Sequence, residues 1–141
     1  MKLFPLISYL LLEHKITIDK SIKNFDDEKL KYLKLFIDFV CSNLKLEEEC
    51  DVVLTNDRTN GMSTGGYSPS TNKIYILIKN RAFIDFSRTI AHELKHQEQR
   101  ELGLLTPEAG KDGDKFENES NAFAGVMMRE FSRKYPGIYD L

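Results

Sequence analysis

The sequence predicts an α+β fold in which short strands pack against long helices. Three observations support this prediction. The 141 residues, 41% of them hydrophobic, are enough for one buried core. Apolar side chains alternate in two short segments, residues 51–55 and 73–79, which is typical of strands. They recur at helical spacing in two long segments, residues 83–102 and 116–135.

One domain is expected to span residues 1–141, because no internal repeat, low-complexity tract or linker interrupts the chain. We predict a helical N-terminal part in residues 1–45 and the core of the fold in residues 50–141. Residues 6–12 are mostly apolar but too few to cross a bilayer, which takes about 20 residues. They also lack a convincing signal-peptide cleavage site. We expect them to pack on the core of a protein that stays in the cytoplasm.

The first well-marked helix is predicted after the capping residues Asn24 and Asp26. Its apolar side chains recur every three or four residues with lysines between them, so one face can pack on a core. These side chains are Leu30, Leu33, Phe36, Ile37, Val40 and Leu44. Cys41 and Cys50 lack CxxC spacing, and we expect ordinary thiols rather than a metal pair or a disulfide.

The two predicted strands flank residues 56–72, which are rich in Gly, Ser, Thr and Asn and therefore favour turns. One further short strand is predicted near Gly65. A polar loop, residues 103–115, separates the two long helices. The first of these helices carries an apolar stripe that anchors it in the core. The stripe consists of Phe83, Phe86, Ile90 and Leu94.

The charge of the chain is close to neutral. It carries 20 lysines and arginines against 22 acidic residues. This balance gives no reason to expect nucleic acid or an anionic membrane surface as a partner. Recognition must therefore depend on a specific site.

A metal-binding pattern lies in the predicted helix 83–102, where His92, Glu93 and His96 form an H-E-x-x-H motif. At 100° per residue, the two histidines lie about 40° apart and one turn along the helix, so both imidazoles can reach one tetrahedral zinc ion. Glu93 is rotated about 100° from His92. It is therefore predicted to lie beside the ligands and to take a proton from a zinc-bound water.

The third ligand is predicted to be a carboxylate, because no histidine follows His96 and His14 is far away in sequence. The downstream candidates are Glu98, Glu101, Glu108, Asp112, Asp114, Glu117, Glu119, Glu130 and Asp140. Helical geometry favours Glu117, which shares the buried face of helix 116–135, whereas Glu119 falls outside it. A carboxylate on such a face is costly unless it is paired with a charge or a metal. Asn121, one turn later, is placed to hydrogen-bond a ligand histidine.

Two simpler interpretations remain open at this point. The histidines can be surface side chains of an inert, solvated helix. Glu117 can be a carboxylate that only stabilises the positive end of a helix dipole.

These residues resemble the gluzincin clan of zinc peptidases, and especially its single-domain members, the minigluzincins. The resemblance rests on His92-Glu93-x-x-His96 followed by Glu117-x-x-x-Asn121. The segments 65–69, 73–79 and 88–91 also resemble small metallopeptidases encoded in tailed-phage genomes. A looser similarity is to the ImmA/IrrE type of regulatory peptidase. Together these likenesses cover roughly residues 52–135.

The resemblance implies a zincin-like fold, with a small mixed or antiparallel sheet next to the helix that carries the histidines. It also implies one zinc ion per chain, held by His92, His96 and Glu117. It makes Glu93 the base and proton shuttle, and Asn121 the partner of a ligand histidine. Many gluzincins have aspartate where this chain has Asn121, so that hydrogen bond would be neutral here. The larger gluzincins also place a tyrosine or histidine over the reacting carbonyl. In this chain the possible donors are Tyr67, Tyr135 and Tyr139.

The implied function is that of a zinc-dependent metalloendopeptidase, acting as a monomer on a peptide or protein in the cytoplasm, which is the host cytoplasm if the chain is phage-encoded. The resemblance also implies an edge strand that binds an extended peptide, for which residues 65–68 are the candidate. A different reading is a non-hydrolytic regulator or adaptor that keeps the fold and binds a protein partner. A third is a toxin or a repressor-cleaving factor with the same chemistry.

Overall fold

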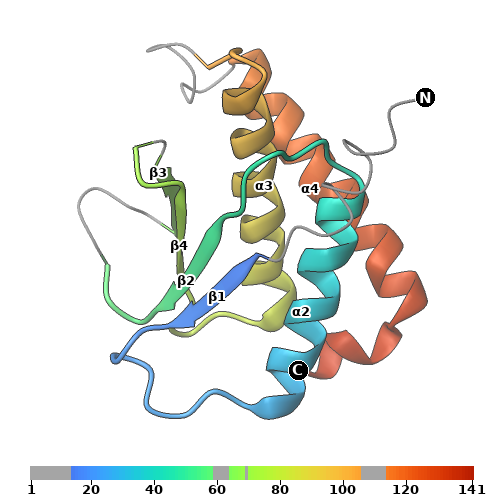
Figure 1. Cartoon of the computed structure of the whole chain (residues 1–141). Helices are drawn as coiled ribbons and strands as arrows, with labels where there is room; N and C mark the ends of the chain where they lie inside the picture. The colour runs from blue at the N-terminus through green and yellow to red at the C-terminus, as the bar shows by residue number, and fades with distance from the viewer. Residues whose placement is uncertain (1–13, 59–63, 69, 106–113) are drawn as a thin grey trace.

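The computed structural model describes residues 14–58, 64–68, 70–105 and 114–141. The predicted apolar element at residues 6–12 and most of the predicted loop at 103–115 lie outside this part of the chain. The elements follow one another in the order shown in Figure 1. They are β1 (Lys15–Ile18), α2 (Asp27–Ser42), β2 (Asp51–Thr55), β3 (Gly65–Ser68), β4 (Lys73–Leu77), α3 (Phe83–Glu101), α4 (Lys115–Lys134) and the 3₁₀ helix η1 (Pro136–Asp140).

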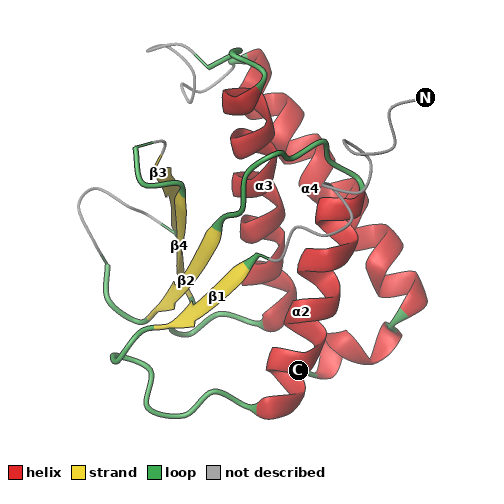
Figure 2. Ribbon diagram, in the orientation of Figure 1, coloured by secondary structure: helices red, strands yellow, loops and turns green. Residues whose placement is uncertain are grey.

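The fold has a sheet layer and a helix layer, as Figure 2 shows by colour. The four strands are arranged in the order β1-β2-β4-β3. β1, β2 and β4 run parallel, and β3 pairs antiparallel with β4 at the edge. Helix α3 contacts β3 and β4 on one side and α2 and α4 on the other. The predicted small mixed sheet is confirmed, and α3 lies between the sheet and the other two helices.

Strand β2 forms where it was predicted, and β4 ends at Leu77, two residues earlier than expected. The buried residues of both strands alternate with half-buried ones, so each strand directs one face toward the helices. The chain leaves the sheet after Ile78, whose N–H still binds the Thr55 carbonyl, and turns at Asn80 with a φ of 59°. Because this turn redirects the chain into α3, the strand cannot continue to residue 79.

The N-terminal part is not purely helical, because it contains the strand β1. This strand pairs in parallel with β2, so that Ile16 lies opposite Val52. Four residues with two isoleucines give too short an alternation to predict a strand from sequence. The pairing also joins segments more than 30 residues apart, which the local sequence does not reveal.

The helices begin and end within a residue or two of their predicted positions. Asp26 caps α2 by accepting a hydrogen bond from the Lys29 N–H, as its sequence position indicated. The core between α2 and α4 includes an edge-to-face contact between Phe36 and Phe131, whose ring centres are 5.1 Å apart. None of the helices in the described residues has the length and apolar character needed to cross a membrane.

Helix α3 also holds the connection between α2 and β2, through side chains near its C-terminal end. Glu98 accepts a hydrogen bond from the Lys45 N–H at 2.8 Å, and Glu101 accepts from the N–H groups of Glu47 and Glu48. Gln97 donates to the Glu48 carbonyl at 2.8 Å. We call this set of contacts the loop clamp. It satisfies backbone groups that no strand or helix pairs, and it fixes α3 against the rest of the fold.

Candidate functional site

Two histidines project from the same face of α3. His92 and His96 are one turn apart, and their side chains are 14% and 12% exposed. The opposite stripe of the helix, Phe83, Phe86, Ile90 and Leu94, is buried as predicted. Because the apolar stripe packs into the core, the two imidazoles on the other face of α3 lie at the edge of the core.

Glu117 reaches the histidines from the first turn of α4. That turn is set by Asp114, which caps the helix by accepting hydrogen bonds from the N–H groups of Phe116 and Glu117. Glu117 Oε1 lies 2.8 Å from His92 Nε2, and Glu117 Oε2 lies 3.0 Å from His96 Nε2. The structure therefore brings together the three residues predicted as metal ligands.

The geometry of these three side chains fits a metal ion. The two Nε2 atoms are 3.1 Å apart, and the three ligand atoms form one compact group. In a tetrahedral zinc site with bonds of about 2.0–2.1 Å, neighbouring ligand atoms are about 3.3 Å apart. Two imidazoles and a carboxylate are also a donor set that zinc accepts. Small outward shifts of the side chains are enough to seat the ion.

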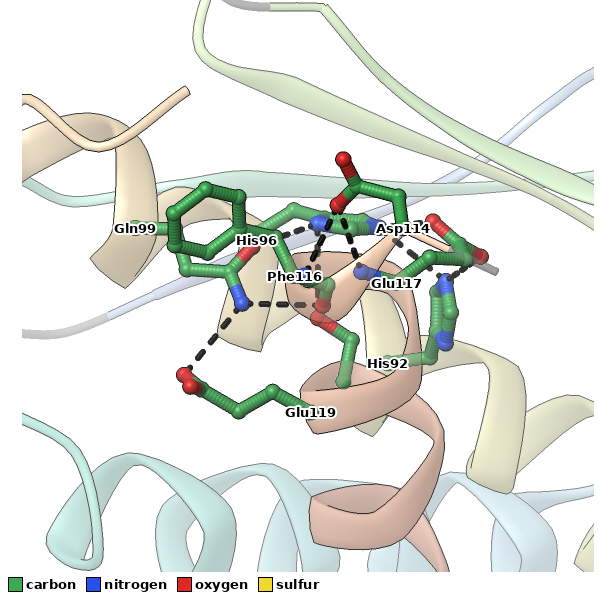
Figure 3. Close-up of polar contacts among 8 residues, drawn as sticks. His92, His96, Gln99, Asp114, Phe116, Glu117 and Glu119 are labelled. Atoms are coloured by element: carbon green, nitrogen blue, oxygen red, sulfur yellow. Dashed lines mark hydrogen bonds and ion pairs between the residues drawn. The ribbon is translucent and has the colours of Figure 1, made fainter. Parts of the chain in front are cut away.

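The contacts of Gln99, drawn in Figure 3, determine which nitrogen of His96 is left to bind a metal. Its amide N–H groups donate to the Phe116 carbonyl at 3.0 Å and to Glu119 at 3.3 Å. Its oxygen therefore faces His96 Nδ1 at 2.8 Å and accepts the proton of that nitrogen. This leaves the Nε2 lone pair directed toward Glu117 and His92. Gln99 is 1% exposed, so water does not compete for these contacts.

Two further residues of α4, Ser120 and Asn121, lie next to the histidines. The Ser120 hydroxyl lies 3.3 Å from His96 Nδ1. Burial lowers the pKa of the His92 imidazole, while the Glu117 carboxylate and Asn121, the partner expected from the sequence, act in the opposite direction. Gln99 and Ser120 were not identified from the sequence, although each follows a proposed ligand by three residues on its helix.

Glu93 lies beside the ligands but outside their group. Its side chain is almost fully buried, and burial raises its pKa to about 7. The nearby Glu117 carboxylate raises the pKa further, while His96 lowers it. A divalent cation held by the three ligand atoms would favour the ionised carboxylate. Burial thus makes the Glu93 carboxylate a stronger base than that of an exposed glutamate, which suits a general base.

A polar pocket of about 310 Å³ opens beside these residues. It is lined by Thr64, Gly65, Asp85, Arg88, Thr89, His92, Glu93, Glu117, Asn121 and Ala124. The lining comes from α3, α4 and the start of β3. The proposed base and two of the proposed ligands therefore face the same pocket, next to the edge strand of the sheet.

Comparison with solved structures identifies the fold. Two crystal structures of Wss1 from Saccharomyces cerevisiae, a protein of the zincin-like class, share this architecture. The fold is zincin-like. One of them, a mutant, matches with a TM-score of 0.59 at 16% identity, over 86% of this chain and 94% of that chain. The other has a TM-score of 0.60 at 15% identity, over 86% and 91%. No protein-family model and no curated protein matches the sequence.

Within this zincin-like fold, Arg81 fixes the wall of the pocket. Its guanidinium donates to the carbonyls of Leu77 and Thr64 at 2.7 and 3.2 Å. It also donates to Thr89 Oγ1 at 2.6 Å and pairs with Asp85 at 2.9 Å. One side chain thus joins the end of β4, the start of β3 and the first turns of α3.

Gly65 allows β3 to lie close to α3. A Cβ atom at this position would be 2.6 Å from the Thr89 methyl carbon and 3.2 Å from Ile76. At the neighbouring Gly66, a Cβ atom would meet nothing within 4 Å. The edge strand therefore approaches the site helix through a glycine at one specific position.

We expect Gly65→Ala to lower the free energy of unfolding by about 1–3 kcal/mol, because it overpacks the contact with Thr89. Gly66→Ala is the matched control and should change stability by less than about 0.5 kcal/mol. Urea denaturation measures both. Thr89→Ser removes the clashing methyl group but keeps the hydroxyl bound to Arg81. Combined with Gly65→Ala, it should recover part of the loss. Equal losses at Gly65 and Gly66 would contradict this explanation.

The tyrosines named as possible donors to a reacting carbonyl do not line the pocket. The Tyr67 hydroxyl donates to Asn72 at 2.9 Å and accepts from Arg100 at 2.6 Å. Tyr135 packs on Tyr32 and Phe131, and Tyr139 is 66% exposed.

His14 is also engaged away from the site. Its Nδ1 accepts a hydrogen bond from the Cys50 N–H at 3.0 Å. It therefore does not belong to the ligand group. Cys41 and Cys50 are free thiols, as predicted, and burial raises the pKa of Cys50 to about 12.

Proposed function

We propose that this chain is a zinc-dependent metalloendopeptidase with His92, His96 and Glu117 as the zinc ligands and Glu93 as the general base. The observation that carries the proposal is the convergence of two Nε2 atoms and one carboxylate from two helices, with the buried Glu93 in the same pocket. A structural zinc site has four protein ligands, whereas three leave one position open for reaction. The zincin-like fold agrees with this assignment.

A bound zinc ion supplies Lewis acidity, which polarises a peptide carbonyl and acidifies a water molecule. The residues of the chain do the rest. Glu93 accepts a proton from the attacking water and then delivers it to the nitrogen of the departing amine. Its burial excludes bulk water from this proton transfer. Gln99 keeps His96 in the tautomer whose Nε2 is a ligand.

The substrate is proposed to bind in an extended conformation along β3. Among the described residues, this strand is the edge of the sheet and pairs with β4 alone, so no other described strand uses its outer backbone groups. Gly65 lines the pocket, and Gly66 leaves space above the strand. An added strand would therefore pass beside Glu93.

We propose that, among zincin-like proteins, this chain is related to the gluzincins and minigluzincins. The third ligand in this proposal is a glutamate on the helix after the H-E-x-x-H helix, 21 residues beyond His96. The cytoplasm, a host cytoplasm if the gene is carried by a phage, remains the proposed location.

The function is tested by comparing a cell extract treated with the zinc-loaded wild type and with the zinc-loaded Glu93→Gln variant. Mass spectrometry of new N-termini should reveal cleavage sites made only by the wild type, with about one zinc per chain in both proteins. A zinc content far below one ion per chain would contradict the assignment of His92, His96 and Glu117 as zinc ligands. Zinc binding without wild-type-specific cleavage would favour the non-hydrolytic adaptor instead.

A further inference from the structure

Arg88 lies one helical turn before His92, on the face of α3 that carries the proposed ligands. It is exposed, and it lines the same pocket as Glu93 and Glu117. Among the described residues of that lining, it is the only basic side chain apart from the proposed ligand His92. Its charge therefore lies close to where a substrate would have to enter.

The guanidinium of Arg88 rests on the backbone of α4. A Cβ atom at Gly125 would lie 3.3 Å from Arg88 Nη2 and 3.9 Å from its Cζ. Gly125 is in the interior of α4, where glycine costs about 0.5–1 kcal/mol relative to alanine. The missing side chain at Gly125 leaves room for the guanidinium beside the pocket.

The acidic groups around the pocket are already engaged. Asp85 pairs with Arg81 at 2.9 Å, and the two oxygens of Glu117 face the two histidines. Glu93 is buried. Among the ion pairs formed between described residues, none includes Arg88. The planar fork of its N–H donors is thus available to a ligand in the pocket, and this fork matches a carboxylate.

We propose that Arg88 binds a carboxylate of the peptide substrate and makes the enzyme specific for peptides that carry one near the scissile bond. The carboxylate is that of an aspartate or glutamate side chain or of a free C-terminus. This inference rests on the proposed peptidase function, because it assigns the substrate class of the same pocket. Arg88 acts in it as a specificity residue, while Glu93 carries the proton.

The test measures peptide binding and does not need turnover. The probes are fluorescein-labelled octapeptides of alanine and serine with one glutamate at each position in turn. Each has a glutamine counterpart and is made with a free and with an amidated C-terminus. Fluorescence polarisation gives their affinities for the Glu93→Gln chain, zinc-loaded and metal-free. At one or more positions, the glutamate peptide should bind about tenfold more tightly than its glutamine counterpart, or the free C-terminus about tenfold more tightly than the amidated one.

Arg88→Met in the same background keeps a long side chain over Gly125 but removes the donors, and it should reduce this preference to less than about twofold. Arg88→Lys should keep part of it, because the charge remains without the fork. Arg129→Ala removes an exposed arginine from α4 outside the pocket and should leave the preference unchanged. The glutamate series and the C-terminal pairs separate the two sources of carboxylate.

The outcomes distinguish this inference from the proposed function. A carboxylate preference that depends on Arg88 supports the inference even if the wild type cleaves nothing. Cleavage by the wild type would overturn it if glutamate and glutamine peptides bind equally well and free and amidated C-termini also bind equally well. An equal loss of affinity for both peptide types in Arg88→Met would also overturn it, since that result indicates a purely structural role.

Discussion

Replacing Glu93 by glutamine is expected to lower the rate of peptide hydrolysis by about 10²–10⁴-fold and to leave the zinc content unchanged. Glutamine has nearly the same shape but cannot take a proton from water. Glu93 lies outside the group formed by His92, His96 and Glu117, so the ligand set is complete in the variant. Burial raises the pKa of Glu93 to about 7, so its carboxylate accepts a proton more readily than that of an exposed glutamate.

The measurement uses a peptide taken from the wild-type cleavage sites, with the rate and the zinc content determined on the same samples. Glu130→Gln is a suitable control, because it makes the same chemical change on the exposed face of α4. It should cleave at the wild-type rate. Undiminished cleavage by Glu93→Gln would rule out its role as the base. Loss of zinc from that variant would show that the residue supports metal binding instead.

Replacing Glu117 by glutamine is expected to weaken zinc binding by more than about 100-fold. Loss of a residue that only orients a ligand already costs about 10–100-fold in metal affinity, and removal of a charged ligand should cost more. Each oxygen of Glu117 lies within 3.0 Å of one imidazole nitrogen, so a neutral amide disturbs both sides of the site. Hydrolysis should fall with zinc occupancy.

Glu119→Gln is the matched control for Glu117. Glu119 lies two residues further along α4, is half exposed, and contacts Lys95 and Gln99 rather than the two histidines. Its replacement should change zinc affinity by less than about tenfold. Competition against a chromophoric chelator measures both variants. Similar losses for the two would mean that the charge of the region, and not the ligand geometry, holds the metal.

The sequence predicted the α+β zincin-like class, which is confirmed, and most of its elements. The long helices and the strands β2 and β4 were predictable because their apolar periodicities extend over enough residues to be unambiguous. Strand β1 was not, because its partner is distant in the chain. Glu117 could be preferred over Glu119 by helical angle alone, and the structure brings Glu117 to the histidines.

The surroundings of the site were harder to predict. Gln99 and Arg88 gain their roles from contacts with α4, namely the Phe116 carbonyl and the backbone at Gly125. No local pattern encodes a contact between two helices separated by a polar loop. Tyr67 illustrates the opposite case, since its residue type suited a catalytic donor but its hydroxyl is committed to Arg100 and Asn72.

The loop clamp holds α3 by contacts that do not involve the proposed metal ligands. Glu98, Glu101 and Gln97 bind the backbone of residues 45–48 and hold α3 in place without help from the ligand face. Within the described part of the chain, the hydrophobic core contains none of His92, His96 and Glu117. In zinc fingers, by contrast, the metal itself provides the folding energy. For the proposed zinc peptidase, we therefore expect the chain to fold before the ion binds, so that a cell short of zinc would accumulate a folded but inactive protein.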